Sequence, residues 1–295
     1  KHIEKEGGEV TYLKVKDNGL VDLAELEAAI KPNTILIALM YANNEIGTVM
    51  PMKEISAIAK KHGVLVFSDA VQAVGKIPVN VIEDGIDLMA FTAHKMYGPK
   101  GVGALYVRRK NPRVKVTAQL DGGGHERGMR SGTLNVPGIV GFGKACEICM
   151  NEMEEETARV SKLRDKLQTE LLKVEESYLN GDKEHKLPHV TNISFKHVEG
   201  EGLLMGFNKN IALSSGSACT SASLEPSYVL KALGLGDDLA HSSLRFGLGR
   251  FTTEEQIDYT VEQVTNTVNK LREMSPLWEM YKEGIDLDTI EWAHH

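Results

Sequence analysis

The feature that most constrains the fold is a unit repeated through the first half of the chain. Each unit is a short apolar run, a polar residue at its end, and a stretch with helical spacing of apolar residues. Strands that alternate with helices favour an α/β fold with a mainly parallel sheet and helices on both faces. The predicted strands are Val10–Leu13, Ile35–Met40, Val64–Phe67, Leu88–Phe91 and Val102–Val107.

The segment between the second and third apolar runs carries the signals of a helix. Pro51 suits the first helical position, and Ile55, Ile58 and Ala59 repeat with helical spacing. Gly63 suits the end of that helix. The sequence here therefore predicts a strand, a helix and a strand.

Polar residues follow three consecutive predicted strands. They are Asn43-Asn44-Glu45 after the first, Asp69 with Gln72 after the second, and His94-Lys95 after the third. In doubly wound sheets, ligands bind outside the carboxyl ends of the strands. We therefore predict a binding site at this edge of the sheet.

The pattern changes at about Ile148, which separates a predicted domain of residues 1–150 from a smaller α+β domain of residues 151–295. The second domain is expected to begin with a long helix and to continue with a strand, a helix and a strand. The helix has apolar residues at Val160, Leu163, Leu167, Leu171 and Val174, and the later elements are Val190–Phe195, Glu201–Phe207 and Ile211–Leu213.

The C-terminal part is predicted to contain one more long helix. Thr252 and Glu255 have the spacing of a capping box, and the residues after them repeat with helical spacing. The tail from Ser275 to His295 contains both tryptophans and is not expected to be buried.

Composition and charge exclude several classes of protein. The net charge of −7 gives no basic surface for nucleic acid or an anionic membrane. The longest apolar stretch, Ile35 to Ala42, is eight residues, far short of the roughly 20 that a membrane-spanning helix needs. Three cysteines favour a reducing compartment over a disulfide-stabilised secreted domain. No targeting peptide is visible, although the chain opens on Lys1.

Lys95 and Asp69 are the residues from which a chemistry can be argued. A lysine that follows a strand and precedes a glycine-rich stretch can form a Schiff base with a carbonyl cofactor such as pyridoxal phosphate. Asp69, 26 residues earlier, could pair with the protonated pyridine nitrogen of that cofactor. Taken singly, each has a simpler interpretation, a solvated lysine and a helix-capping aspartate.

The motifs around these residues resemble those of fold-type I pyridoxal-phosphate enzymes, and within them those of cysteine desulfurases of the IscS/NifS type. A segment from Ser214 to Tyr228 resembles the active-cysteine loop of the housekeeping iron–sulfur desulfurases. The resemblance extends over the whole chain, and the other segments that carry it are residues 43–47, 69–72, 92–101, 122–133 and 275–280.

The resemblance implies a role for each residue of the cofactor site. Lys95 would form the Schiff base, Asp69 would pair with the pyridine nitrogen, and Gln72 would bind the phenolic oxygen. Thr92 and His94 would help to hold the phosphate, and His94 would also shuttle protons, since its charge changes nearest neutral pH.

Three further residues are implied in substrate binding and assembly. Asn44 would lie near the cofactor and the substrate carboxylate. Arg245 would clamp that carboxylate, because its planar fork suits two oxygens. Thr133 would reach the phosphate of a neighbouring subunit, so the resemblance implies a homodimer with shared sites.

Cys219 lies in a run of small residues that could bring a nucleophile to a cofactor and then to a partner. Composition alone favours an inert buried cysteine, but the motif identifies Cys219 as the residue that takes the persulfide. The resemblance also implies that Cys219 could be a shared iron–sulfur ligand during transfer to a scaffold.

Three other motifs are given structural interpretations. Cys146 and Cys149 form a C-x-x-C pair, which we expect to pack on a helix rather than to bind zinc. Gly122–Gly124 lacks the spacing of a nucleotide-binding loop and is expected to be a structural or interface loop. His294 and His295 are expected to be solvated.

The expected activity is therefore conversion of L-cysteine to L-alanine, with sulfur passed to an iron–sulfur scaffold or to tRNA-thiolation carriers. The tail from Trp278 to Trp292 would dock the scaffold. The protein itself is expected to make no direct contact with nucleic acid or with a membrane. The expected compartment is the bacterial cytoplasm, with the mitochondrial matrix as the alternative. Another pyridoxal-phosphate enzyme, such as an aminotransferase or a selenocysteine lyase, and an inactive scaffold-binding fragment are the alternative functions.

The sequence departs from the family pattern in four places. An earlier segment, with a phosphate-binding Ala-Thr pair and a histidine that stacks on the pyridine ring, does not precede Lys1, so we expect the chain to be a fragment. Thr92 stands where serine is usual, Ala93 where glycine is usual, and Val71 where threonine or alanine is usual.

Overall fold

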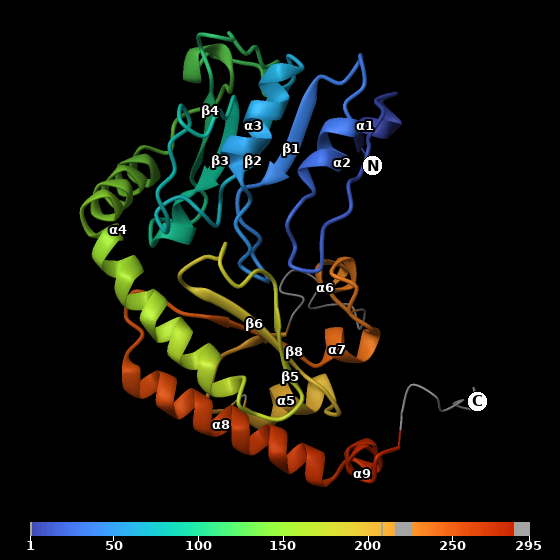
Figure 1. The fold of residues 1–295 in the computed structure, drawn as a ribbon. Coiled ribbons are helices and arrows are strands. Elements are labelled where there is room, and N and C mark those ends of the chain that lie inside the picture. The colour runs from blue at the N-terminus through green and yellow to red at the C-terminus, as the bar shows by residue number, and fades with distance from the viewer. Residues whose placement is uncertain (1, 208, 216–225, 286–295) are drawn as a thin grey trace. The chain divides into compact units, whose positions relative to one another are not determined.

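The computed structural model describes residues 2–207, 209–215 and 226–285, which form two compact units (Figure 1). Unit 1 contains residues 20–43 and 48–157 together with the N-terminal residues up to Lys16. Unit 2 contains residues 17–19 and 44–47 and the described residues from Ala158 onward. Within these described ranges, no helix is both long enough and apolar enough to cross a lipid bilayer.

Unit 1 is built on a four-stranded sheet of order β1-β2-β3-β4. Strands β1, β2 and β3 are parallel, and β4 pairs antiparallel to β3. This mainly parallel sheet confirms the predicted α/β class, and four of the five predicted strands are present with shifts at their ends. The strands are β1 (Leu36–Met40), β2 (Leu65–Asp69), β3 (Leu88–Thr92) and β4 (Gly103–Val107).

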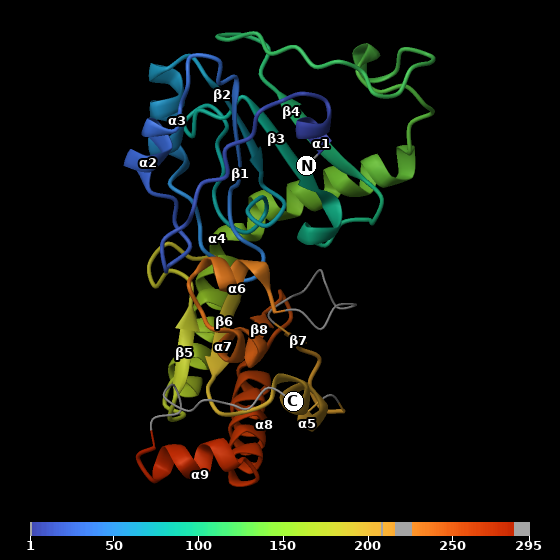
Figure 2. The ribbon, with the colours of Figure 1, turned by 90° about the vertical axis from the view of Figure 1, so that its right-hand side faces the viewer.

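Helices cover both faces of this sheet. Figure 2 shows α2 (Leu23–Ala28) and α3 (Met52–Lys61) on one side and the first part of α4 (Val136–Leu171) on the other. The shorter helices are α1 (His2–Lys5) and the 3₁₀ turns η1 (Ala93–Met96) and η2 (Glu126–Gly128). The predicted helix after Pro51 is confirmed, although Pro51 is its cap rather than its first residue.

Two expectations for unit 1 were wrong. Val10–Leu13 forms no strand, and the nearest β contact is a single bridge between Val15 and Val21. A strand forms only where a neighbouring strand pairs with it, and the apolar pattern of one segment does not show whether such a neighbour exists. Helix α4 begins at Val136 rather than near residue 148, because the Asn135 side chain accepts a hydrogen bond from the amide of Gly138 (3.2 Å).

Unit 2 contains an antiparallel sheet of order β5-β6-β8-β7. Its apolar residues pack against the second half of α4 and against α5 and α8, which gives the unit its own core. The strands are β5 (Ser177–Asn180), β6 (Val190–Phe195), β7 (Ser214–Ser215) and β8 (Ser243–Gly247); the helices are α5 (Gly200–Phe207), α6 (Tyr228–Ala232), α7 (Asp237–His241), α8 (Glu254–Glu273) and α9 (Pro276–Lys282).

Two predicted details of unit 2 are shifted along the chain. Ile211–Leu213 is not a strand; it packs partly against the core and leads into β7. The capping box of α8 is formed by Thr253 and Gln256, one residue later than predicted. Thr252 is not available for this purpose, because its hydroxyl accepts a hydrogen bond from the amide of Gly249 (2.9 Å) in the preceding turn.

The expectation that the tail is not buried is confirmed for residues 275–285, none of which is buried, although their first part forms a helix. Residues 276–282 form α9, and Trp278 stacks on Tyr281 with ring centroids 5.2 Å apart. The guanidinium of Arg272 lies over the Trp278 ring at 4.5 Å. Trp292 lies outside the described residues.

Arg272 is a charged side chain that is only 2% exposed. Its guanidinium donates to the backbone carbonyls of Glu175 (2.6 Å), Glu176 (3.2 Å) and Lys196 (2.8 Å). These carbonyls lie beside β5 and just after β6. Arg272 therefore joins the end of α8 to one edge of the unit 2 sheet.

We expect Arg272→Ala to destabilise unit 2 by about 3 kcal/mol, because a buried guanidinium and its hydrogen bonds to three backbone carbonyls are lost. Arg272→Lys should recover only part of this loss, since an ammonium group lacks the planar fork. Urea unfolding followed by Trp278 fluorescence in a Trp292→Phe background measures the effect. Lys282→Ala, which removes an exposed pair with Glu175 (2.7 Å), is the control. Equal midpoints for the alanine variants at 272 and 282 would contradict the prediction.

Candidate active site

In unit 1, strands β2 and β3 end at or just before several of the residues predicted to hold a cofactor. The two strands are parallel, and Asp69 at the end of β2 lies opposite Ala90 of β3. Strand β3 ends at Thr92 and continues directly into η1, which carries His94 and Lys95. The polar side chains therefore lie at one edge of the sheet, as the sequence predicted.

The turn after β2 fixes the carboxylate of Asp69. One of its oxygens, Oδ1, accepts a hydrogen bond from the amide of Val71 (3.0 Å), and the Asp69 carbonyl accepts one from the amide of Tyr41 (2.8 Å). The turn that begins at Val71 also contains Gln72, which is partly buried. Asp69 and Gln72 thus follow the same strand at fixed positions.

Thr92 sets the orientation of His94. The Thr92 hydroxyl donates to the carbonyl of Val102 (3.2 Å) and lies 3.0 Å from Nδ1 of His94. Because the single hydroxyl proton is used on Val102, we assign the proton of this second bond to Nδ1 of His94. Nε2 of His94 is then the nitrogen that can accept a proton.

Buried neighbours hold η1 so that Lys95 is exposed. Ala93 and Met96 are buried against Phe142 and Ala145 of α4. Their spacing leaves His94 and Lys95, the two residues between them, on the outer side of the turn. Tyr97 then ends η1 in the left-handed conformation, with φ of 65°.

In unit 2, Arg245 and Asn44 lie in direct contact. Arg245 is partly buried in β8, and its Nη1 donates to the Asn44 carbonyl (3.0 Å). Its Nη2 donates to the hydroxyl of Ser214 in β7 (3.1 Å). The two residues predicted to bind the substrate carboxylate are therefore neighbours, although 201 positions apart.

The short segment Asn44–Gly47 is bound to the sheet of unit 2. Asn192 of β6 donates from its side chain to the Glu45 carbonyl (3.2 Å), and the amide of Leu187 donates to the Gly47 carbonyl (2.8 Å). Gly47 has φ of +74°, and a Cβ at this position would contact Val190 at 3.4 Å. A side chain here would be strained, which explains the glycine.

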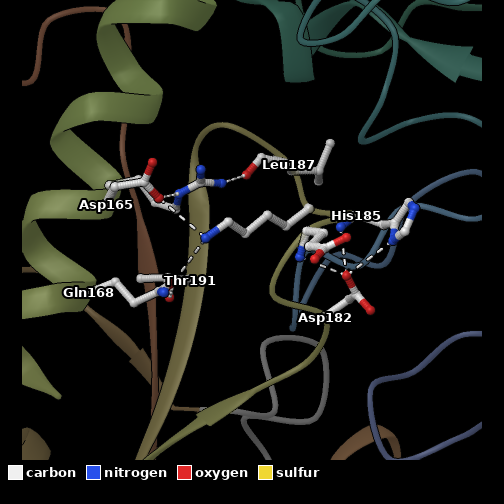
Figure 3. A network of polar contacts seen from close by, with 9 residues as sticks. Asp165, Gln168, Asp182, His185, Leu187 and Thr191 are labelled. Carbon is white, nitrogen blue, oxygen red and sulfur yellow. Dashed lines mark hydrogen bonds and ion pairs between the residues drawn. The ribbon is translucent and has the colours of Figure 1, made fainter.

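A polar network holds the loop that supplies Leu187 (Figure 3). Arg164 of α4 donates to the Leu187 carbonyl, and Lys186 pairs with Asp165 (3.2 Å). At the start of the loop, the Asp182 carboxylate accepts the amide of Glu184 (2.8 Å). The backbone that binds Gly47 is thus tied to helix α4.

Glu45 is a buried residue of this site that sequence reasoning left without a role. It is 4% exposed and accepts a hydrogen bond from the hydroxyl of Ser227, the cap of α6. Burial raises the pKa of Glu45, while the bond from Ser227 and the charge of Arg245 act in the opposite direction. Both residues belong to the sequence motifs quoted above, but their contact joins positions 182 apart and leaves no local signal.

Other predicted site residues are not joined to these clusters. Thr133 is exposed in an irregular stretch after η2. Cys219, the segment 216–225 that contains it, His294 and His295 lie outside the described residues.

The C-x-x-C pair lies on α4, where the sequence placed it. Cys149 is buried, and burial raises the pKa of the Cys146 thiol, which opposes a reactive thiolate. Over the described ranges, no group of three or more His, Cys, Asp or Glu residues is placed to hold a metal ion. Both cysteines pack with the buried residues Ala93, Met96 and Phe142, so the expectation that they pack on a helix is confirmed.

We expect Glu45→Gln to stabilise the protein at pH 8 and to have little effect at pH 4. Folding raises the pKa of Glu45, so the folded protein binds more protons than the unfolded chain at pH values from about 4.5 up to the raised pKa. The free energy of unfolding of the wild type therefore falls as the pH rises through this range. Thermal unfolding across this pH range measures the difference.

A matched control variant should change the stability at pH 8 in the opposite direction. The ion pair with Lys231 lowers the pKa of Asp237, so Asp237→Asn should destabilise the protein at pH 8 and have no effect well below pH 4. A Glu45→Gln variant that followed the same profile as Asp237→Asn would show that the Glu45 carboxylate is not disfavoured by burial.

Comparisons with known proteins show the family to which the chain belongs. The model of the family "Aminotransferase class-V" matches residues 1–260. The chain is 58% identical over 295 residues to cysteine desulfurase IscS of Escherichia coli O139:H28, covering 100% of this chain and 72% of that protein. A solved NifS-like protein superposes with a TM-score of 0.83 at 35% identity, covering 92% of this chain and 71% of the other.

A second solved structure, the NifS-like protein of Rickettsia africae, has a TM-score of 0.82 at 30% identity and covers 91% of this chain and 72% of its own. The family match includes residues of both units. The relatives named above, which are 30–58% identical to this chain, are a cysteine desulfurase and two NifS-like proteins. The chain therefore belongs to the class-V aminotransferase family, among cysteine desulfurases of the IscS/NifS type.

Proposed function

We propose that this protein is a pyridoxal-phosphate-dependent cysteine desulfurase that converts L-cysteine to L-alanine and carries the sulfur as a persulfide on Cys219. The observation that carries the proposal is the placement of Asp69 and Lys95 after neighbouring parallel strands in a chain 58% identical to an IscS. A carboxylate and an amine at this edge are the groups that a pyridine aldehyde requires.

The side chains of unit 1 fit pyridoxal 5′-phosphate, the cofactor of this family. The amine of Lys95 would hold the aldehyde, and the oriented carboxylate of Asp69 would pair with the ring nitrogen. Gln72 would bind the phenolic oxygen, while Thr92 and His94 would contact the phosphate. When bound, the cofactor supplies an electron sink for the α-carbon of the substrate.

Proton transfer is proposed for Lys95 and His94. The exposed Lys95 amine lies on a short turn and can accept the α-proton once the substrate has displaced it. Nε2 of His94 is the acceptor nitrogen of the tautomer assigned above. The hydrogen bond to Thr92 keeps that ring in one orientation while the proton moves.

Substrate orientation is proposed for Arg245 and Asn44. The guanidinium of Arg245 can offer two parallel N–H groups to a carboxylate. In the structure its Nη2 donates to Ser214, so the substrate carboxylate would have to take the place of that hydroxyl. The bond from Nη1 to the Asn44 carbonyl would hold the guanidinium during this exchange.

The sulfur step is proposed for Cys219. Its thiolate would form a bond to the substrate sulfur while the carbon–sulfur bond breaks, and the electron pair of that bond would stay with carbon. Protonation of this carbon gives alanine, and the sulfur remains on Cys219 as a persulfide. Transfer to an iron–sulfur scaffold would follow, with Cys219 as a shared cluster ligand.

The domains and the assembly are proposals of the same kind. Unit 1 would be the cofactor-binding domain, and unit 2 would carry the cysteine segment and a partner-binding tail. A homodimer would bring Thr133 to the phosphate of a second subunit; the exposed apolar side chains near Thr133 support such a contact. These are Leu134, Val136, Ile139 and Val140, which are 37–66% exposed. We place the enzyme in the bacterial cytoplasm.

We expect alanine release from L-cysteine to fall by at least about a hundredfold in Cys219→Ala, because the nucleophile is lost. Cys146→Ala, which removes a thiol with no proposed role, should keep the wild-type rate. Lys95→Ala should lose the visible absorbance of bound pyridoxal phosphate. Alanine and sulfide are measured with added cofactor and a reductant.

Two results would reject the proposal. Alanine formation by Cys219→Ala at the wild-type rate would indicate another pyridoxal chemistry, such as that of a selenocysteine lyase. A wild type that develops no visible absorbance with pyridoxal phosphate would indicate a protein that only binds partners.

A further inference from the structure

Glu45 is a buried carboxylate directly beside the residues proposed to bind the substrate. Asn44 and Glu45 share one peptide unit, so the carbonyl that receives Nη1 of Arg245 and the amide of Glu45 move together. The Glu45 side chain in turn accepts a hydrogen bond from Ser227. A continuous chain of contacts therefore runs from Ser227 through Glu45 and Asn44 to Arg245.

Some contacts of the segment Asn44–Gly47 hold its backbone, and another holds the side chain of Glu45. Asn192 and the amide of Leu187 hold the carbonyls of Glu45 and Gly47. The side chain of Glu45 makes a separate bond, to the first turn of α6. Removal of that bond would take away one restraint on the segment that carries the Asn44 peptide.

Burying a carboxylic acid at position 45 is unfavourable to folding, and packing alone does not explain why an acid stands there. Burial disfavours the charged form of a carboxylate, while the hydroxyl of Ser227 and the charge of Arg245 favour it for Glu45. A structural hydrogen bond to Ser227 alone could be made by a neutral amide. The negative charge, however, also acts on Arg245, the cation of the proposed clamp.

We propose that Glu45 is a positioning residue for the substrate clamp: through Ser227 and the Asn44 peptide, it holds the guanidinium of Arg245 in the place where it receives the substrate carboxylate. The inference rests on the proposed function and deepens it. Ser227 also follows Cys219 by eight residues in the sequence, so the same bond fixes the chain shortly after the proposed nucleophile.

The test measures alanine formation by the full-length protein loaded with pyridoxal phosphate, as a function of L-cysteine concentration. Glu45→Ala should raise KM by about tenfold or more, the effect of one charge-assisted hydrogen bond, with kcat within about threefold of the wild type. Glu45→Gln keeps an oxygen for Ser227 but loses the negative charge that acts on Arg245, so its KM should lie between those of the wild type and Glu45→Ala. Asp84→Asn, a change at another buried carboxylate, bonded to Tyr41 (3.1 Å), is the control and should leave KM unchanged.

A double-mutant cycle separates positioning from general destabilisation. If Glu45 acts through Ser227, Ser227→Ala should raise KM, and the double variant should be no worse than Glu45→Ala alone. Additive effects on KM, or equal losses in the alanine and glutamine variants at position 45, would overturn the inference. Ser227→Ala also supplies a variant if Glu45→Ala does not fold.

Amide hydrogen exchange gives a readout that does not need activity. The amide of Leu187 donates to the Gly47 carbonyl, so its exchange reports whether the Asn44–Gly47 segment is held. It should exchange faster in Glu45→Ala than in Glu45→Gln, and unchanged exchange would overturn the inference. A wild type that makes no alanine would reject the proposed function, whereas an active Glu45→Ala with the wild-type KM would reject the inference alone.

Discussion

Parallel pairing of β2 with β3 is the constraint on which the candidate cofactor site depends. Parallel strands end at the same edge, so residues that follow them in sequence become neighbours in space. Asp69 lies opposite Ala90, two residues before the end of β3, and η1 starts directly after Thr92. The burial of Ala93 and Met96 then leaves His94 and Lys95 on the outer side. Hydrogen bonding within the sheet thus sets the chemistry at its edge.

The cluster of Asn44 and Arg245 depends on a different interaction. The four residues Asn44–Gly47 are hydrogen-bonded to parts of unit 2 that lie much later in the chain. Asn44–Gly47 follows β1 in the chain but is held by Asn192, Leu187 and Arg245 of unit 2. Glycine at position 47 permits the backbone turn, and the buried acid at position 45 makes a further bond to α6. A buried carboxylate disfavours folding at neutral pH, which is easier to explain in a binding site than in a core.

Sequence patterns predicted elements well where the signal is local. The run Leu65–Asp69, the helix after Pro51 and the strand Val190–Phe195 each contain their own apolar pattern and end signals. Val10–Leu13 failed because a strand needs a partner, which its own pattern does not reveal. The capping box was misplaced by one residue because Thr252 and Thr253 are both hydroxyl residues, and only the turn at Gly249 decides between them.

The sequence by itself determined the α/β class, the family through its motifs, and the strand-end positions of Asp69 and Lys95, because these depend on residue type and spacing along the chain. Only the tertiary structure decided that Arg245 binds the Asn44 carbonyl, that Ser227 binds Glu45, and that the first part of the tail packs on Arg272. These contacts join residues far apart in the chain. Their partners are selected by packing and by the need to satisfy buried polar groups, which no local pattern encodes.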